Sequence, residues 1–143
     1  MKLEELPRWA VELLGSARSA HLGLLDEEEL PRVLVVTFAV WEGAIWSAVD
    51  QKPKRTAEPA RVRRLRRWPS ASLLVDLYDD DWSRLAWVEV RGAVSVEPLG
   101  PAVDALAAKY PQYLTEPPPG PLLRLEPERY GCWRASQPDQ PPG

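Results

Sequence analysis

The sequence predicts a mainly β fold, a barrel of about six short antiparallel strands with accessory helices. Short apolar runs rich in β-branched residues recur along the chain, separated by turns that contain Gly, Pro or clustered acids. Successive hairpins outnumber any strand–helix–strand pattern, which favours antiparallel pairing. Closing such a sheet into a barrel removes its exposed edges. We therefore expect a closed barrel.

Each element follows from a local pattern. A helix is expected over residues 3–18, because apolar residues recur there every three or four positions. Glu42-Gly43 is a hairpin turn between two of the expected strands, which span 20–25, 33–40, 44–49, 73–77, 87–96, 122–125 and 130–134. Further helices are expected over 57–68 and 101–110. Residues 1–136 form one domain in this interpretation, and the Pro-rich residues 137–143 form a disordered tail.

Composition excludes several classes of protein. No apolar run approaches the roughly 20 residues that span a bilayer, and Glu4 and Glu5 argue against a signal peptide, so a cytoplasmic protein without membrane contact is expected. Cys132 and His21 are the single cysteine and histidine. They supply neither a disulfide nor a metal-ligand set, and they disfavour a hydrolytic triad.

The most informative segment is basic. Eight Lys and Arg residues and one acid, Glu58, lie between positions 52 and 67. Thr56 is predicted to cap the helix over 57–68, with Val62 and Leu65 facing the core. Lys54, Arg55, the Thr56 hydroxyl and the free N–H groups of the first helical turn would then converge on a phosphate.

Two other interpretations of the basic segment remain. One is a solvated helix face without a ligand. The other is nucleic-acid binding, which the net charge of −3 and the lack of a groove-reading motif disfavour.

Several motifs resemble one family. The Lys52-Pro53-Lys54-Arg55-Thr56 run is similar to the pyridoxamine-5′-phosphate-oxidase-like FMN-binding split-barrel superfamily, and within it to the branch described as dependent on coenzyme F-420. The resemblance covers about residues 15–135. Its other motifs are Val36-Thr37-Phe38-Ala39, Ala48-Val49-Asp50, Leu73-Leu74-Val75-Asp76-Leu77-Tyr78, Asp81-Trp82-Ser83-Arg84-Leu85, Val90-Arg91-Gly92 and Lys109-Tyr110-Pro111-Gln112-Tyr113.

This resemblance implies a six-stranded antiparallel split barrel that forms a homodimer, with the cofactor sites at the subunit interface. The cofactor would be FMN or F-420, which the motifs do not distinguish, and a hydride would move to or from a small-molecule substrate. No catalytic acid or base stands out. The implied cofactor-binding residues are Lys52, Lys54, Arg55 and Thr56 for the phosphate, Val36, Thr37 and Ser47 for the ring and ribityl chain, and Trp82 as a wall, from the partner subunit.

The chain departs from the family pattern at several positions, among them Arg64 and Trp68, where the family branch often has Asn. The resemblance leads us to expect a Trp-Trp pair followed by Arg where this chain has Ala86-Trp87 and Glu89. Glu89 would repel a phosphate if it faced one. A flavin-binding carrier without turnover therefore stays open as an alternative to an oxidoreductase.

Overall fold

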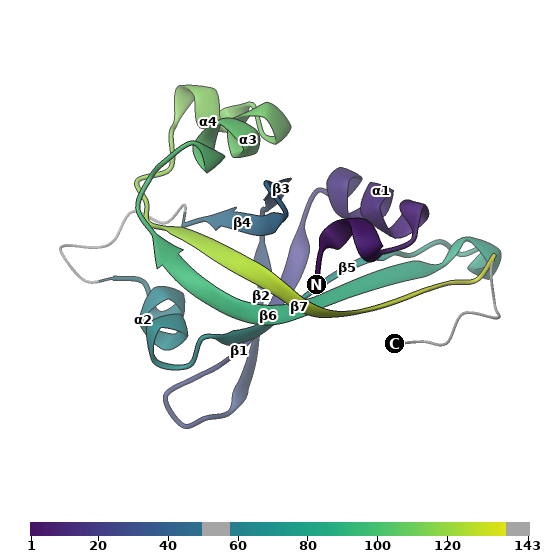
Figure 1. Cartoon of the computed structure of the whole chain (residues 1–143), viewed down its shortest axis with the longest axis horizontal. Coiled ribbons are helices and arrows are strands. Elements are labelled where there is room, and N and C mark those ends of the chain that lie inside the picture. Colours follow the sequence, from purple (N-terminus) through teal and green to yellow (C-terminus); the bar gives the residue numbers. More distant parts are fainter. Residues whose placement is uncertain (50–57, 137–143) are drawn as a thin grey trace.

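A seven-stranded antiparallel sheet forms the framework of the computed structural model, which describes residues 1–49 and 58–136. The strands lie in the order β2-β1-β5-β6-β7-β4-β3. The two longest strands, β6 and β7, run through the length of the molecule (Figure 1). The strands are β1 (Ala20–Leu25), β2 (Pro31–Val36), β3 (Ala39–Trp41), β4 (Ala44–Ala48), β5 (Ser70–Leu77), β6 (Ala86–Glu97) and β7 (Leu122–Arg134).

Helices cover the sheet at separate places. The α3 and α4 helices lie together above β3 and β4, whereas α2 lies below that same end of the sheet and α1 lies over its middle (Figure 1). The helices are η1 (Leu3–Glu5), α1 (Arg8–Ser16), α2 (Ala60–Arg67), η2 (Trp82–Arg84), α3 (Ala102–Lys109) and α4 (Gln112–Thr115). None of those in residues 1–49 and 58–136 is both long and apolar enough to cross a membrane.

The mainly β antiparallel class with accessory helices is confirmed, but the closed six-stranded barrel is wrong. The sheet has seven strands, and β2 and β3 are its two outer strands among the described residues. The strand predicted over 33–40 stops at Val36 and resumes at Ala39. The strands predicted over 122–125 and 130–134 are one continuous strand, β7.

Side chains interrupt the sheet at Thr37 and Phe38. The Ser47 hydroxyl donates to the Thr37 carbonyl oxygen at 2.7 Å, and the Phe38 N–H donates to the Tyr110 hydroxyl at 3.2 Å. These bonds satisfy buried backbone groups that would otherwise need a neighbouring strand. The chain can therefore leave β2 and enter β3 at this point.

A bulge lets β7 continue past Pro127. The β6–β7 register shifts between Arg91 and Gly92, where Gly92 lies opposite Pro127. A Cβ atom at Gly92 would collide with the carbonyl oxygen of Glu126. Only glycine permits this close approach, and proline is tolerated in a strand at such an irregularity.

The core lies between the sheet and the helices. Val62 and Leu65 of α2 are fully buried, as predicted, and Leu14 of α1 joins the same cluster. The helix predicted over 3–18 is divided at Pro7, which occupies the position before α1. Proline is favoured near a helix start because it has no N–H and a fixed φ.

Candidate functional site

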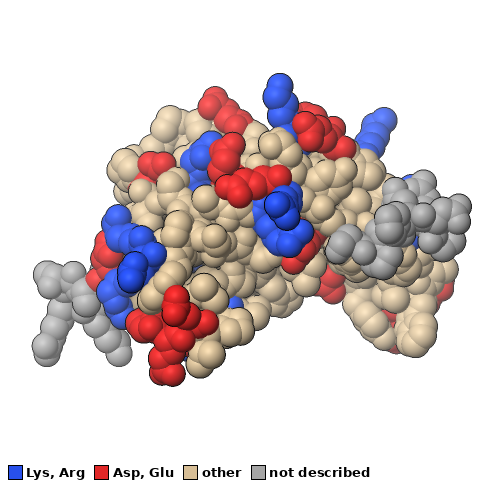
Figure 2. Space-filling view, turned by 60° about the horizontal axis from the view of Figure 1, so that its bottom comes forward, with Lys and Arg blue, Asp and Glu red and all other residues tan. Residues whose placement is uncertain are grey.

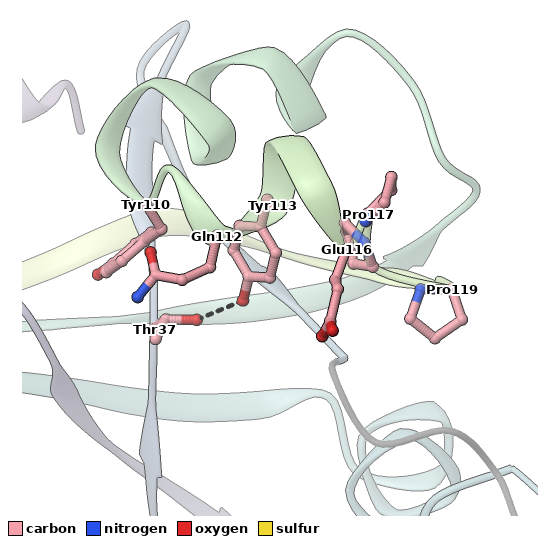
Figure 3. Close-up of a pocket in the computed structure, with 8 residues that line it drawn as sticks. Thr37, Tyr110, Gln112, Tyr113, Glu116, Pro117 and Pro119 are labelled. Carbon is pink, nitrogen blue, oxygen red and sulfur yellow. Dashed lines mark hydrogen bonds between the residues drawn. The ribbon is translucent and has the colours of Figure 1, made fainter.

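A cavity of about 290 Å³ lies beside the break between β2 and β3, and Thr37 lines it. The opposite wall comes from the segment that joins α3 to β7 (Figure 3). The residues that line the cavity are Thr37, Tyr110, Gln112, Tyr113, Glu116, Pro117, Pro118 and Pro119.

Hydroxyl groups hold the inner wall in place. The Thr37 and Tyr113 hydroxyl oxygens are 2.9 Å apart and share a hydrogen bond (Figure 3). The Tyr110 hydroxyl accepts from the Phe38 N–H and donates to the Arg18 carbonyl oxygen at 2.9 Å. Because Tyr110 and Tyr113 are both buried, this part of the cavity is preorganised.

The remaining walls differ in character. The three prolines 117–119 present rigid, largely apolar surfaces, and Gln112 and Glu116 are exposed at the rim. The Glu116 carboxylate points in the same direction as the Tyr113 hydroxyl (Figure 3). Apolar walls with a few fixed polar groups are the usual composition of a site for a small organic ligand.

Two of the predicted cofactor-binding residues, Ser47 and Val36, lie next to Thr37 but do not line the cavity. Ser47 is 5% exposed, and its hydroxyl hydrogen is directed to the Thr37 carbonyl oxygen. The Val36 side chain is buried in the core cluster. Ser47 thus positions Thr37, and Val36 anchors the strand that leads to it.

The predicted phosphate-binding residues belong to the segment that follows β4. Lys52, Lys54, Arg55 and Thr56 lie outside the described residues, as does the tail predicted over 137–143. The segment that contains the motif follows the buried Val49, directly after β4, and precedes Glu58.

The predicted start of the central helix is wrong. The α2 helix begins at Ala60, and Pro59 stands at its N-cap position without a side-chain cap. Pro59, and not Thr56, therefore occupies the N-cap position of this helix. Pro59 sets this start because the residue before a proline is disfavoured in helical conformation.

The arginines of α2 are largely paired with nearby groups. Arg64 donates to both carboxylate oxygens of Glu27 at 3.1 Å, and Arg66 lies 2.8 Å from Glu58. The hydrogen bond from Arg66 lowers the pKa of Glu58 below its usual value. Lys and Arg alternate with Asp and Glu over the face in Figure 2, which does not favour a nucleic-acid interface.

Lys109 is a residue for which the sequence predicted no role. Its amine lies 3.8 Å from the centroid of the Phe38 ring, is buried, and has no hydrogen-bond partner in the described part of the chain. Burial, followed by repulsion from Arg18, lowers its pKa from 10.5 to about 8. Phe38 is therefore held by Tyr110 at its backbone and covered by Lys109 on its ring.

The motif at residues 109–113 was a sequence feature from which part of the cavity wall could have been predicted. They stood in one of the motifs of the resemblance, but no functional residue was assigned there. The structure brings Tyr110, Gln112 and Tyr113 to the cavity wall with Thr37. The run Pro117-Pro118-Pro119-Gly120 by itself indicates a stiff loop and not a binding site, and no pattern singles out Glu116.

Trp82 and Glu89 lie elsewhere in the same chain. Trp82 is 69% exposed and begins η2, in the connection between β5 and β6. This connection lies at the end of the molecule opposite α2 (Figure 1). Glu89 accepts a hydrogen bond from Ser72 at 2.9 Å and lies 3.5 Å from Arg91. Neither lines the Thr37 cavity within the residues that the structure describes.

Comparison with known proteins establishes the fold. No protein-family model and no curated protein matches the chain. A conserved hypothetical protein from Mycobacterium tuberculosis is similar in structure, with a TM-score of 0.76, 18% identity and coverage of 95% of this chain and 89% of that one. An F420 reductase gives a TM-score of 0.69 at 22% identity, with 88% and 98% covered. A FAD-binding protein from Mesorhizobium loti gives 0.64 at 14% identity, with 89% and 94% covered.

These likenesses define the class of fold. The chain shares the split-barrel fold of these three proteins, which is the fold that the sequence motifs led us to expect. At these identities the shared property is the fold, so the function is argued from the site.

Proposed function

We propose that the protein is an oxidoreductase that binds a flavin or deazaflavin, FMN or F-420, and transfers a hydride to or from a small molecule. The observation that carries this proposal is the cavity at Thr37, which combines a fixed hydroxyl pair with a wall of prolines. Two solved structures of the same fold, described as an F420 reductase and a FAD-binding protein, support the choice of cofactor.

The residues present suit a flat heterocyclic ring. Such a ring has apolar faces, which the prolines would cover, and a polar edge, which Thr37 and Tyr113 would meet with hydrogen bonds. Ser47 and Tyr110 bond to the carbonyl oxygen and the N–H of the peptide group that joins Thr37 to Phe38, and so hold the Thr37 backbone in place. The basic segment that follows β4 would bind the phosphate through Lys52, Lys54, Arg55 and Thr56.

The cofactor would supply the hydride chemistry, and the protein would bind it and orient the substrate. Glu89 was the residue that favoured a carrier without turnover. Glu89 pairs with Ser72 and Arg91 away from the cavity, so its charge gives less support to a carrier. A hydride-transfer assay on a substrate panel separates an enzyme from a carrier, since a carrier binds the cofactor and turns nothing over.

We extend the proposal to a homodimer. Val33 and Val35 of the outer strand β2 are 69% and 66% exposed, and Leu74 of β5 is exposed on a strand two places along the sheet. Adjacent exposed apolar side chains on a strand indicate a protein contact. A second copy on this face would also allow Trp82 to wall the partner's cavity.

Cofactor binding is tested by titrating the purified protein with FMN and with F-420 and following absorbance. Changing Lys54 and Arg55 together to Ala is expected to weaken binding at least tenfold, because two charge-assisted bonds are lost. The control changes Lys2 and Arg8, two exposed cations near the N-terminus, to Ala. Equal affinity of the two double variants would refute the phosphate assignment.

The dimer has a separate test. Changing Val33 and Val35 together to Ser is expected to convert a dimer into a monomer in analytical ultracentrifugation, because the apolar contact is lost. The control is Val11→Ser, at an exposed position of α1. A monomeric wild-type protein, or a dimer in the double variant, would contradict this part of the proposal.

A further inference from the structure

A second cavity, of about 350 Å³, lies between α1 and the end of the sheet where β5, β6 and β7 meet. It shares no residue with the Thr37 cavity. Its apolar wall contains Leu13, Leu77 and Ala86, and its polar wall contains Trp9, Arg84 and Arg134.

Two buried N–H donors at this cavity have no acceptor among the residues that the structure describes. They are the indole Nε1 of Trp9 and the Nε of Arg134, and neither has a hydrogen-bond partner in the described chain. A buried donor without an acceptor is costly and rare in native proteins. The guanidinium carbon of Arg134 lies 5.2 Å from the centroid of the Trp9 ring, so the two donor groups are neighbours.

The polar wall is positively charged. Arg84 and Arg134 both line the cavity, and no acidic side chain lines it among the residues that the structure describes. The nearest ion pair of Arg84 is long, with its Nη1 3.6 Å from Asp79. Two cations and an indole N–H together favour an anion that accepts several hydrogen bonds.

We propose that this cavity binds a small organic carboxylate. The Nε and a terminal nitrogen of an arginine form a planar fork that matches the two oxygens of a carboxylate. The indole N–H of Trp9 supplies a further donor at the same place. The apolar part of the ligand would lie against Leu13 and Leu77, a surface that inorganic phosphate would leave uncovered.

Ala86 keeps the cavity open. It lies directly opposite Arg134 in the β6–β7 pair, and its side chain is a single methyl group. A larger apolar side chain at this position would occupy the space beside the guanidinium. Ala86→Leu therefore closes the proposed site without removing either donor.

The experiment is a titration of the full chain with benzoate, benzamide and inorganic phosphate. Binding is followed by the NMR signal of the Trp9 indole N–H, which is identified by its loss in Trp9→Phe. Benzoate is expected to shift this signal in a saturable way. Benzamide, which has the same ring without the charge, and phosphate are expected to shift it little.

Variants locate the site. Arg134→Gln is expected to weaken benzoate binding about tenfold or more, because a charge-assisted bond is lost, and Ala86→Leu is expected to block it. Trp9→Phe, followed through the remaining indole signals or by calorimetry, should weaken it about threefold or more. Arg129→Gln, at an exposed position of the same strand, is the control and should leave binding unchanged.

Three results of the benzoate and benzamide titrations would overturn this proposal. They are no saturable shift with benzoate, an equal response to benzamide, and wild-type affinity in Arg134→Gln. The FMN titration separates this site from the proposed cofactor site, because Arg134→Gln should bind FMN as the wild type does. Impaired FMN binding in that variant would also overturn a separate carboxylate site.

Discussion

Replacing Lys109 with Met tests how the protein tolerates a buried amine beside its candidate site. The Lys109 amine lies over the Phe38 ring without a hydrogen-bond partner in the described chain. Burial is the main reason that its pKa falls from 10.5 to about 8, and Arg18 adds to the effect. Met fills similar space with an unbranched apolar chain, so the substitution removes the charge and keeps most of the packing.

The size of the effect follows from the pKa. A shift of this size corresponds to roughly 3 kcal/mol in the absence of solvent screening. Solvent screening of the half-buried side chain reduces that figure. The contact with Phe38 favours the charged amine by about 0.5–1 kcal/mol. We therefore expect Lys109→Met to raise the free energy of unfolding by about 1 kcal/mol at pH 7.

The lowered pKa of Lys109 determines how the free energy of unfolding of the wild type changes with pH. Between pH 8 and 10.5 the folded chain holds fewer protons at Lys109 than the unfolded chain, so the free energy of unfolding of the wild type rises with pH in this window. The free energy of unfolding of Lys109→Met should therefore exceed that of the wild type by the full amount below pH 8. This difference should disappear as the pH approaches 10.5.

Urea unfolding at two pH values, pH 7 and about pH 10, measures this difference. Burial raises the pKa of the Cys132 thiol, but this residue is common to both proteins, so its contribution cancels. Lys2→Met, at an exposed position, is the control. If the free energies of unfolding of the wild type and Lys109→Met differ by the same amount at both pH values, the reasoning is refuted.

Two further predictions concern the fold around the site. Ser47→Ala should lower the free energy of unfolding by about 1–2 kcal/mol in urea, because the partly buried Thr37 carbonyl loses its donor, whereas Ser95→Ala at an exposed position should change little. Equal effects would show that the Ser47 bond does not matter. Gly92→Ala should destabilise the protein by roughly 2 kcal/mol or more in thermal unfolding, because a Cβ atom collides with the backbone of β7. Gly15→Ala, where a Cβ atom meets open space inside α1, should instead stabilise by about 0.5–1 kcal/mol; matching effects at the two glycines would contradict this account.

Local patterns in the sequence predicted most of the elements. The hairpin at Glu42-Gly43, the burial of Val62 and Leu65 and the class of the sheet all follow from spacing and turn chemistry over a few residues. The break at Phe38 does not, because its partner Tyr110 lies 72 residues further along the chain. A β-branched run gave no reason to expect the strand to stop there.

The candidate site divides in the same way. Thr37 stood in a family motif and was predicted, and the structure places it at a cavity. The opposite wall, from Tyr110 to Pro119, needed the packing of α3 against β3 and β4, which depends on contacts far apart in sequence. The pairing of Arg64 with Glu27, 37 residues away, was likewise outside the reach of a local charge count.

The gap between β2 and β3 has a consequence for how this protein can change over evolution. The amide and carbonyl groups at Thr37 and Phe38 bond to a tyrosine and a serine, and the hydroxyl of Thr37 faces an opening. A sequence change that joined β2 and β3 into one continuous strand would add backbone hydrogen bonds to the sheet. It would also move the Thr37 hydroxyl away from the cavity. Selection for a more regular sheet and selection for a ligand therefore oppose each other at these two positions.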